Sequence, residues 1–270
     1  MSPLKITQIG RMSISHQLSI LVILAVVVVF SIFTSYVTVR TANDFEESVE
    51  HQLKEQVKMV SSTLEFFYDS LVNNTDKLSS IFFGMFDDDI VLDEAIKVDV
   101  NGEEVPVLTY RGRVLNQNFA FPDRFTKMTG GTATIFMRNR DDFLRISTSL
   151  RKTDGSRAFG TYLGKTHPGY ETLMSGKSYI GPAHLFGKHY MTKYTPFKDD
   201  SGKVIGILYV GFDYSAQLAL LKQKLSSMVF GDTGYVYAIS AKPGKNQGVL
   251  TLHPSLEGKN LLEIPDAAGN

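Results

Sequence analysis

The sequence has 270 residues, enough for one large domain or two modest ones. Hydrophobic residues make up 43% of it and charged residues 21%, which is typical of a folded protein and not of a disordered chain. The 28 basic residues are balanced by 28 acidic ones, so the chain lacks the basic excess of a nucleic-acid-binding protein. The absence of cysteine excludes disulfides, cysteine-ligated zinc and thiol catalysis.

The N-terminal region contains a long apolar stretch. No residue from Met12 to Val39 carries a formal charge when His16 is counted as neutral, and the apolar core runs over 18–39. At about 1.5 Å per residue, some 22 residues span roughly 33 Å, close to the thickness of a bilayer core. A cleaved signal peptide is the alternative, but its apolar stretch is shorter and ends in small residues. This stretch ends in Tyr36 and β-branched residues, so we expect an uncleaved membrane helix over 18–39.

Charges on either side of the apolar stretch predict its orientation. Lys5 and Arg11 precede it, and four acidic residues follow between positions 44 and 50. Because basic residues remain on the cytoplasmic side, residues 1–17 are expected in the cytoplasm. The chain from residue 40 onward is then expected in the periplasm, anchored to the inner membrane.

Helical spacing of apolar residues continues beyond the membrane. They follow one another mostly at steps of three and four, and neither Pro nor Gly occurs before Gly84. This pattern predicts one long helix that leaves the membrane directly. Its apolar stripe either faces the core of the same chain or, in its membrane-proximal half, packs on a second copy in a homodimer, and both arrangements are compatible. The stripe comprises Phe45, Val49, Leu53, Val57, Val60, Leu64, Phe67, Leu71, Leu78 and Ile81.

From Val105 the pattern changes to short segments of period two separated by Gly and Pro, which is typical of strands. A short helix is expected over 168–175, and Asp199–Lys203 has the composition of a hairpin turn. Antiparallel strands accompanied by helices predict an α+β fold for a first module over residues 40–214. The strand candidates are Val105–Tyr110, Thr132–Met137, Phe143–Ser149, His189–Phe197 and Val204–Phe212.

A connecting helix over 215–230 is expected to lead out of this module. The turn at Gly231–Gly234 then precedes strand candidates at Tyr235–Ile239 and Val249–His253. These features predict the start of a second module over 231–270. We expect the chain to be a fragment of a longer protein or a shortened gene product.

Motifs for enzyme chemistry are absent. The six histidines form no zinc-protease pattern, and the sequence contains no P-loop, no GxGxxG after a strand and no GxSxG elbow. Asp87–Asp89 lacks the spacing of a calcium loop and is interpreted as a solvated acidic turn. We therefore expect no enzyme, no metal and no cofactor, with a membrane-tethered extracytoplasmic enzyme as the alternative.

Several segments, in a fixed order, resemble a Cache domain. The second module resembles the opening of a type 2 Cache module, so the likeness covers residues 40–270. The combination is similar to the fused type 3 and type 2 Cache sensory region of methyl-accepting chemotaxis proteins. The segments are Ile146–Ser149 with Gly155, Ala158 and Gly160-Thr161, Gly181–Tyr190, Tyr194–Asp199 and Gly202–Asp213 in the first module, and Gly231–Tyr237, His253-Pro254 and Gly258–Leu261 in the second.

The resemblance implies a PAS-like sheet behind a long N-terminal helix, facing the periplasm and binding a small molecule. Complete chemoreceptors of this kind continue with a second membrane helix, a HAMP linker and a methyl-accepting coiled coil, none of which is in this sequence. Membrane histidine kinases and diguanylate cyclases also carry Cache domains, so both remain alternative outputs. A membrane anchor that binds no ligand is a third interpretation.

Strand alternation selects the first candidate ligand residues. Over 143–149 it separates an apolar set from Arg145, Ser147 and Ser149. The apolar set is expected to face the long helix, and in Cache domains the opposite face lines the pocket. Arg145 is the candidate anchor for a carboxylate, because guanidinium binds carboxylate through two parallel hydrogen bonds. An exposed strand arginine is the alternative. The apolar set is Leu144, Ile146 and Leu150.

Tyrosines and one aspartate complete the candidate site. Tyr190 and Tyr194 alternate on the next strand, and Tyr179 lies just before it. Each offers a flat apolar ring with a polar tip for a small pocket, or is simply a half-buried strand residue. Asp213 lies where some amino-acid-binding Cache modules hold an ammonium group, although a role in the turn is favoured. The expected ligand is a carboxylate or an amino acid.

Overall fold

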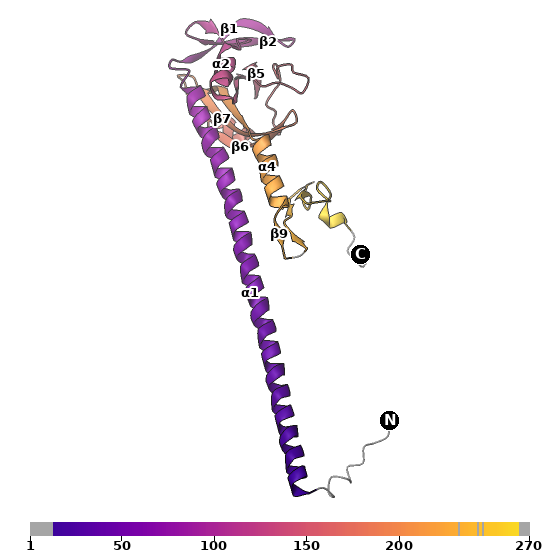
Figure 1. Ribbon diagram of the computed structural model, residues 1–270. Helices are drawn as coiled ribbons and strands as arrows, with labels where there is room; N and C mark the ends of the chain where they lie inside the picture. The colour runs from indigo at the N-terminus through magenta and orange to yellow at the C-terminus, as the bar shows by residue number, and fades with distance from the viewer. Residues whose placement is uncertain (1–12, 232, 242, 245, 265–270) are drawn as a thin grey trace. The chain divides into compact units, whose positions relative to one another are not determined.

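The computed structural model describes residues 13–231, 233–241, 243–244 and 246–264. Lys5 and Arg11, on which the predicted orientation depends, lie outside the described residues, as does most of the predicted cytoplasmic segment. The chain divides into two compact units, 1–67 and 68–270, and each is described by itself. Figure 1 shows the order of the elements along the chain.

Helix α1 (Ile14–Phe83) is 70 residues long and confirms the predicted long helix. It ends one residue before Gly84, the first glycine after the membrane candidate. Within the first unit it contains a segment that is long and apolar enough to cross a membrane, and none of that segment is buried. Several of its hydroxyls donate within the helix, as when Ser31 donates to the carbonyl of Val27 at 2.8 Å.

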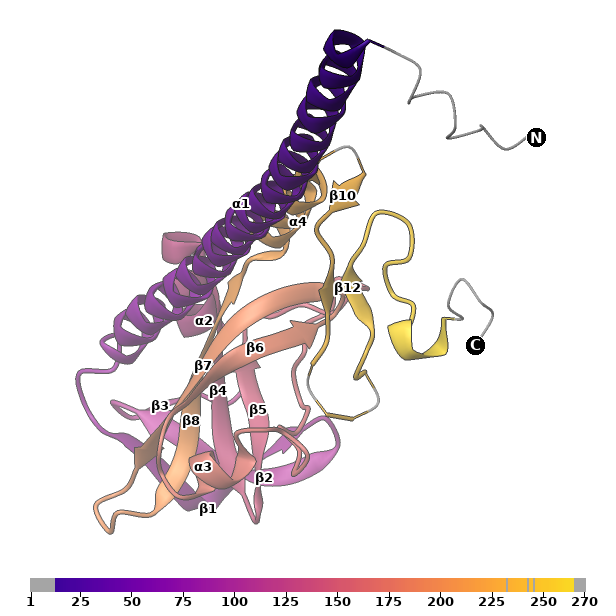
Figure 2. The ribbon, with the colours of Figure 1, turned by 90° about the horizontal axis from the view of Figure 1, so that it is seen from below.

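The second unit is built on a five-stranded antiparallel sheet in the order β5-β4-β8-β7-β6. Figure 2 shows these strands side by side. The sheet confirms the predicted α+β class, and four of its strands coincide with predicted ones to within a few residues. The strands are β4 (Thr132–Asn139), β5 (Asp142–Thr148), β6 (Tyr179–Leu185), β7 (Lys188–Lys198) and β8 (Val204–Asp213).

One face of the sheet packs against helices. Phe82, in the last turn of α1, and Phe125, on α2 (Ala120–Thr129), are both fully buried there and meet edge to face at 5.1 Å. The end of α1 is also bonded to β7, through Asp76 with Lys193 at 2.5 Å. The apolar strand residues of this face are Ala133, Ile135, Met137, Leu144, Ile146, Ile205, Leu208 and Val210.

The opposite face is covered by a separate cluster. Phe136, Tyr194 and Tyr209 pack there with Leu173 of the short helix α3 (Tyr170–Met174), which lies within the predicted helix 168–175. Because both faces are covered, β8 is buried at eight consecutive positions from Val204 to Gly211.

A smaller three-stranded sheet extends the unit. Its strands are β1 (Ile90–Val100), β2 (Glu103–Tyr110), which includes the predicted Val105–Tyr110, and β3 (Arg113–Val114). Strand β1 was not predicted, because most of its side chains are at least partly exposed and a register shift between Asp93 and Lys97 breaks its alternation. Helix α2 and strand β6 were not predicted either.

The last described residues contain short elements. Helix α4 (Ser215–Ser226) lies within the predicted 215–230. The single strand predicted over Tyr235–Ile239 is wrong, because two-residue strands β10 (Gly234–Tyr235) and β11 (Ala238–Ile239) pair with different partners, β9 (Val229–Phe230) and β12 (Leu250–Leu252). A 3₁₀ turn follows at Leu261–Glu263. In the part described, these strands form only two-stranded pairs, which stabilise little β structure by themselves.

We expect residues 41–229, produced without the membrane candidate, to fold as a soluble α+β domain, because the two covered faces of the sheet lie within this fragment. Circular dichroism tests this expectation. A coil spectrum or a purely helical one would contradict it.

Phe82 and Phe83 offer a matched pair of substitutions in that fragment. Phe82 is 0% exposed and Phe83 is 43% exposed, although they are neighbours in the same helical turn. Phe82→Ala should lower the free energy of unfolding by about 3–5 kcal/mol, because it leaves a cavity in the core. Phe83→Ala should lower it by less than about 1 kcal/mol. Urea unfolding of both variants measures the difference, and equal losses would show that α1 is not packed through Phe82.

Candidate functional site

Arg145 is a buried cation on the α3-covered face, on the edge strand β5. Strand β5 places it directly opposite Phe136 of β4, and its guanidinium lies 5.0 Å from the centre of the Phe136 ring. Its Nη1 donates to the carbonyl of Ala158 at 2.9 Å and to Thr161 Oγ1 at 2.6 Å. The residue is only 9% exposed, and among the described residues its buried Nε has no hydrogen-bond partner.

The charge of Arg145 is not neutralised within the part of the chain that the structure describes. Other basic residues have a carboxylate within ion-pair distance. Arg157, for example, donates two hydrogen bonds of 2.7 Å to the carboxylate of Asp123. No such carboxylate accompanies Arg145. Burial lowers the pKa of Arg145, yet guanidinium remains protonated in proteins. An unpaired buried ion costs several kcal/mol, and an anion bound here would offset that cost.

Two tyrosines lie beside the guanidinium and cannot supply the missing charge. Tyr194 and Tyr209 come from β7 and β8, with ring centres 4.9 Å apart, and are 3% and 1% exposed. Burial raises the pKa of Tyr194 to about 12 and that of Tyr209 further still, so both hydroxyls remain protonated at neutral pH. The buried Tyr209 hydroxyl has no well-formed hydrogen bond to a described residue, and the adjacent Thr132 hydroxyl donates to the carbonyl of Gly211. The face therefore holds two unsatisfied buried polar groups.

His167 covers this face from the segment before α3. Its ring centre lies 4.8 Å from that of Tyr194 and 5.4 Å from that of Tyr179. Burial lowers the pKa of His167, so the imidazole is neutral near pH 7, and its Nδ1 accepts from the backbone N–H of Gly169 at 3.1 Å. Gly169 has no room for a Cβ, because the Tyr179 ring lies against it. The sequence analysis did not single out His167, and only its place before a Pro-Gly turn marked it.

The structure brings three of the predicted residues together. Arg145, Tyr179 and Tyr194 share the covered face, with Tyr179 directly opposite Tyr194 in the β6–β7 pairing. Tyr190 is buried on the same face of β7 but packs with Leu150 and Ala158 in a neighbouring cluster.

The predicted common face of Arg145, Ser147 and Ser149 is wrong. A register shift between Ile135 and Phe136 places Ser147, and not Ile146, opposite Ile135, so the alternation of β5 reverses after Arg145. For the same reason Leu150, expected beside Leu144 and Ile146, packs with Tyr190 on the other face.

Both serine hydroxyls are already bonded within the fold. Ser147 donates to the carbonyl of Asn118 at 2.6 Å. Ser149 accepts from the Thr126 hydroxyl at 2.7 Å and from the backbone N–H of Ala133 at 3.0 Å. Neither hydroxyl is positioned next to the guanidinium.

Asp213 is also committed to local structure. Its carboxylate pairs with Lys188 at 2.8 Å and accepts from the backbone N–H of Ser215 at 3.0 Å, where α4 begins. This is the geometry of a turn residue.

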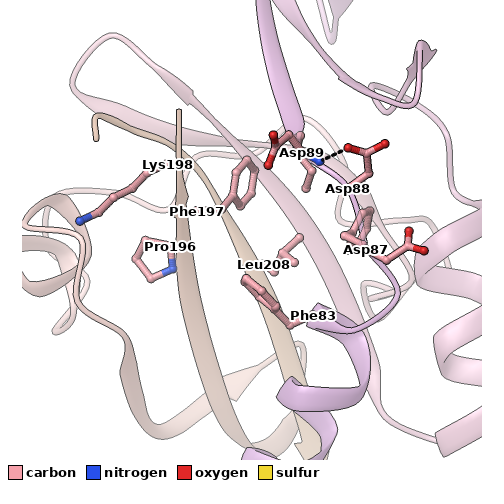
Figure 3. Close-up of a pocket in the computed structure, with 10 residues that line it drawn as sticks. Phe83, Asp87, Asp88, Asp89, Pro196, Phe197, Lys198 and Leu208 are labelled. Atoms are coloured by element: carbon pink, nitrogen blue, oxygen red, sulfur yellow. Dashed lines mark hydrogen bonds between the residues drawn. The ribbon is translucent and has the colours of Figure 1, made fainter. Parts of the chain in front are cut away.

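A separate open pocket of about 510 Å³ lies where α1 ends, beside β7 and β8 (Figure 3). Phe83, Phe197 and Leu208 form its apolar wall, and the acidic turn Asp87–Asp89 lies at its edge. Asp87 accepts from the Tyr110 hydroxyl and pairs with Arg111 at 3.0 Å, so the turn is partly neutralised. Within the described ranges, no three His, Cys, Asp or Glu side chains are grouped to hold a metal.

Comparison with known proteins places the chain in a family. The sequence matches the Cache 3/Cache 2 fusion domain over residues 39–270. The chain belongs to the Cache 3/Cache 2 fusion domain family. The match confirms the predicted Cache resemblance over nearly the same residues. No curated protein matches the chain.

Two solved sensor domains are similar to this Cache chain at low identity. The sensor domain of Escherichia coli DcuS is 18% identical, with a TM-score of 0.26, covering 39% of this chain and 70% of its own. The sensory domain of the Campylobacter jejuni chemoreceptor Tlp3 (CcmL) is 15% identical, with a TM-score of 0.36, covering 68% of this chain and 66% of its own. At these scores the likeness says nothing about the ligand or the output of this Cache chain.

Proposed function

We propose that this Cache chain is the periplasmic sensory region of an inner-membrane receptor and that it binds a small carboxylate, an organic acid or an amino acid, at Arg145. The observation that carries the proposal is the buried guanidinium without an acidic partner in the described chain. A carboxylate there would offset the cost of burying the charge and would satisfy the free Nε.

The bonding of Arg145 indicates how the ligand would approach. Its Nη1 is occupied by Ala158 and Thr161, which fixes the plane of the guanidinium. The Nε edge is then the one available for two parallel bonds to a carboxylate. Tyr194 and Tyr179 would flank the ligand, and His167 would cover it, because these rings already lie against one another on this face. Since Arg145 and Tyr194 are nearly inaccessible, the cover must open for the ligand to enter.

The sheet offers a direct connection from the ligand to α1. Leu144 and Ile146, the neighbours of Arg145 on β5, pack on the other face in the same core as Phe82. The ligand would shift α1 if its affinity were higher with the end of the helix in one position than in another. The helix would then move towards the position of higher affinity. We propose that α1 carries this shift through the membrane.

Dimerisation is part of the proposal. In the first unit, Phe45, Leu53 and Leu64 are exposed along the predicted apolar stripe. A second copy of α1 would cover them, as in other parallel helix pairs.

We propose a chemoreceptor of the methyl-accepting chemotaxis type as the whole protein, and no enzymatic activity for this region. A membrane histidine kinase or a diguanylate cyclase is the second candidate, because Cache regions serve these outputs too. The coding sequence downstream of Asn270 discriminates between them. A methyl-accepting coiled coil supports the first, and a catalytic domain the second.

Substitution of Arg145 tests the site. A thermal-shift screen of organic acids and amino acids first selects a ligand, and calorimetric titration then measures its affinity for the chain in detergent. Because a hydrogen bond to a charged group contributes about 1.5–3 kcal/mol, Arg145→Ala should weaken binding by about ten- to a hundredfold. Arg145→Lys should recover only part of this, because an ammonium group cannot make paired bonds.

Arg151→Ala is the matched control, because Arg151 is an exposed arginine just beyond the same strand. It should bind as the unsubstituted chain does. Unchanged affinity in a folded Arg145→Ala variant would remove Arg145 from the site. A screen that found only cationic or uncharged ligands would reject the carboxylate.

Reporter fusions test the orientation. A fusion of alkaline phosphatase after residue 229 should be active, because the charges flanking the apolar stretch direct this region to the periplasm. The same fusion to a chain without residues 18–39 should be inactive. If a reporter at this position worked only in the cytoplasm, the orientation would be reversed.

A further inference from the structure

Two histidines face each other across the β6–β7 hairpin, outside the Arg145 site. His184 pairs directly with His189, and their ring centres are 4.8 Å apart. The turn between them is short, with Phe186 at φ 51° and Gly187 at φ 81°. Positive φ at both central residues is the geometry of a tight hairpin turn that fixes strand register. The two imidazoles are therefore held together by the backbone of one hairpin.

Both rings have nitrogens available for a ligand. His184 is exposed and His189 is half-buried, and within the described chain neither ring nitrogen takes part in a hydrogen bond. His167 and His253 differ, because their Nδ1 atoms accept backbone N–H groups. Neutral imidazole is the form that binds metal ions.

We propose that His184 and His189 together bind one divalent transition-metal ion, such as Zn²⁺, Ni²⁺ or Cu²⁺. Imidazole nitrogen suits these ions, which lie about 2.0–2.1 Å from it. Ring centres 4.8 Å apart are close enough for one nitrogen of each ring to reach the same ion. Asp213 is not included as a third ligand, because its carboxylate is already paired with Lys188 and accepts the N–H of Ser215. Water completes the coordination, so the site is open and exchangeable, unlike the closed four-ligand sites that stabilise folds.

The position of the site gives the ion a structural effect. It would join β6 to β7, the same two strands that carry Tyr179 and Tyr194. Metal binding at the histidine pair does not depend on carboxylate binding at Arg145, so the two proposals can be tested and rejected separately.

Calorimetric titration of the metal-free chain in detergent, with ZnSO₄ and separately NiCl₂ as probes, tests the proposal. One site that includes this pair is expected. Removing a residue that merely hydrogen-bonds to a metal ligand weakens metal binding about 10–100-fold. Removing a ligand itself, as in His184→Ala or His189→Ala, should therefore weaken binding at least about tenfold. The double variant should lose the site. His253→Ala is the control and should bind as the unsubstituted chain does, because its ring is already hydrogen-bonded.

Gly187→Ala tests the geometry with both histidines retained. A Cβ at Gly187 meets no atom, but φ 81° is strained for alanine, so the turn should shift and metal affinity should fall. Circular dichroism verifies that each variant is folded. Unchanged Zn²⁺ and Ni²⁺ affinity in the folded double variant would overturn the proposal.

Discussion

Burial on both faces of the five-stranded sheet is the constraint on which the second unit depends. Most side chains of β4 and β8 must fit one cover or the other, so the helix end at Phe82 and the segment around α3 are packed against the same strands. Only the backbone of this one sheet therefore separates side chains packed on one face from those packed on the other. Phe82 packs on one face of this sheet, and Arg145 lies over Phe136 on the other.

Against this packed background, the charge of Arg145 is the exception. Its Nη1 is well bonded, so the guanidinium is held in place, but its Nε and its charge are left without partners in the described residues. Native folds rarely keep such a group unless it has a function. The aromatic cover of Tyr179, Tyr194 and His167 excludes water from it, which strengthens any electrostatic interaction made there.

The histidine pair on the β6–β7 hairpin is organised differently. It depends on a local turn and not on the core, and at least one of its rings is open to solvent. An anion at Arg145 and a metal ion at the hairpin would contact the same two strands from different positions. The family membership accommodates both, since a Cache fold provides the sheet and leaves its ligands to individual side chains.

Local sequence was sufficient for the features that depend on neighbours along the chain. The charge-free stretch, the unbroken helix up to Gly84 and the strands with clear alternation each follow from composition and period. Arg145 was identifiable because it is the one arginine on the polar face of a predicted strand whose other face is apolar. Only the tertiary structure decided the faces beyond it, because the register shift at Ile135 reverses the alternation and turns Ser147 and Ser149 away. The contact between His167 and Tyr194 could not be predicted from the sequence either. The two residues are 27 positions apart, and their contact depends on how α3 packs, which produces no periodic pattern in the sequence.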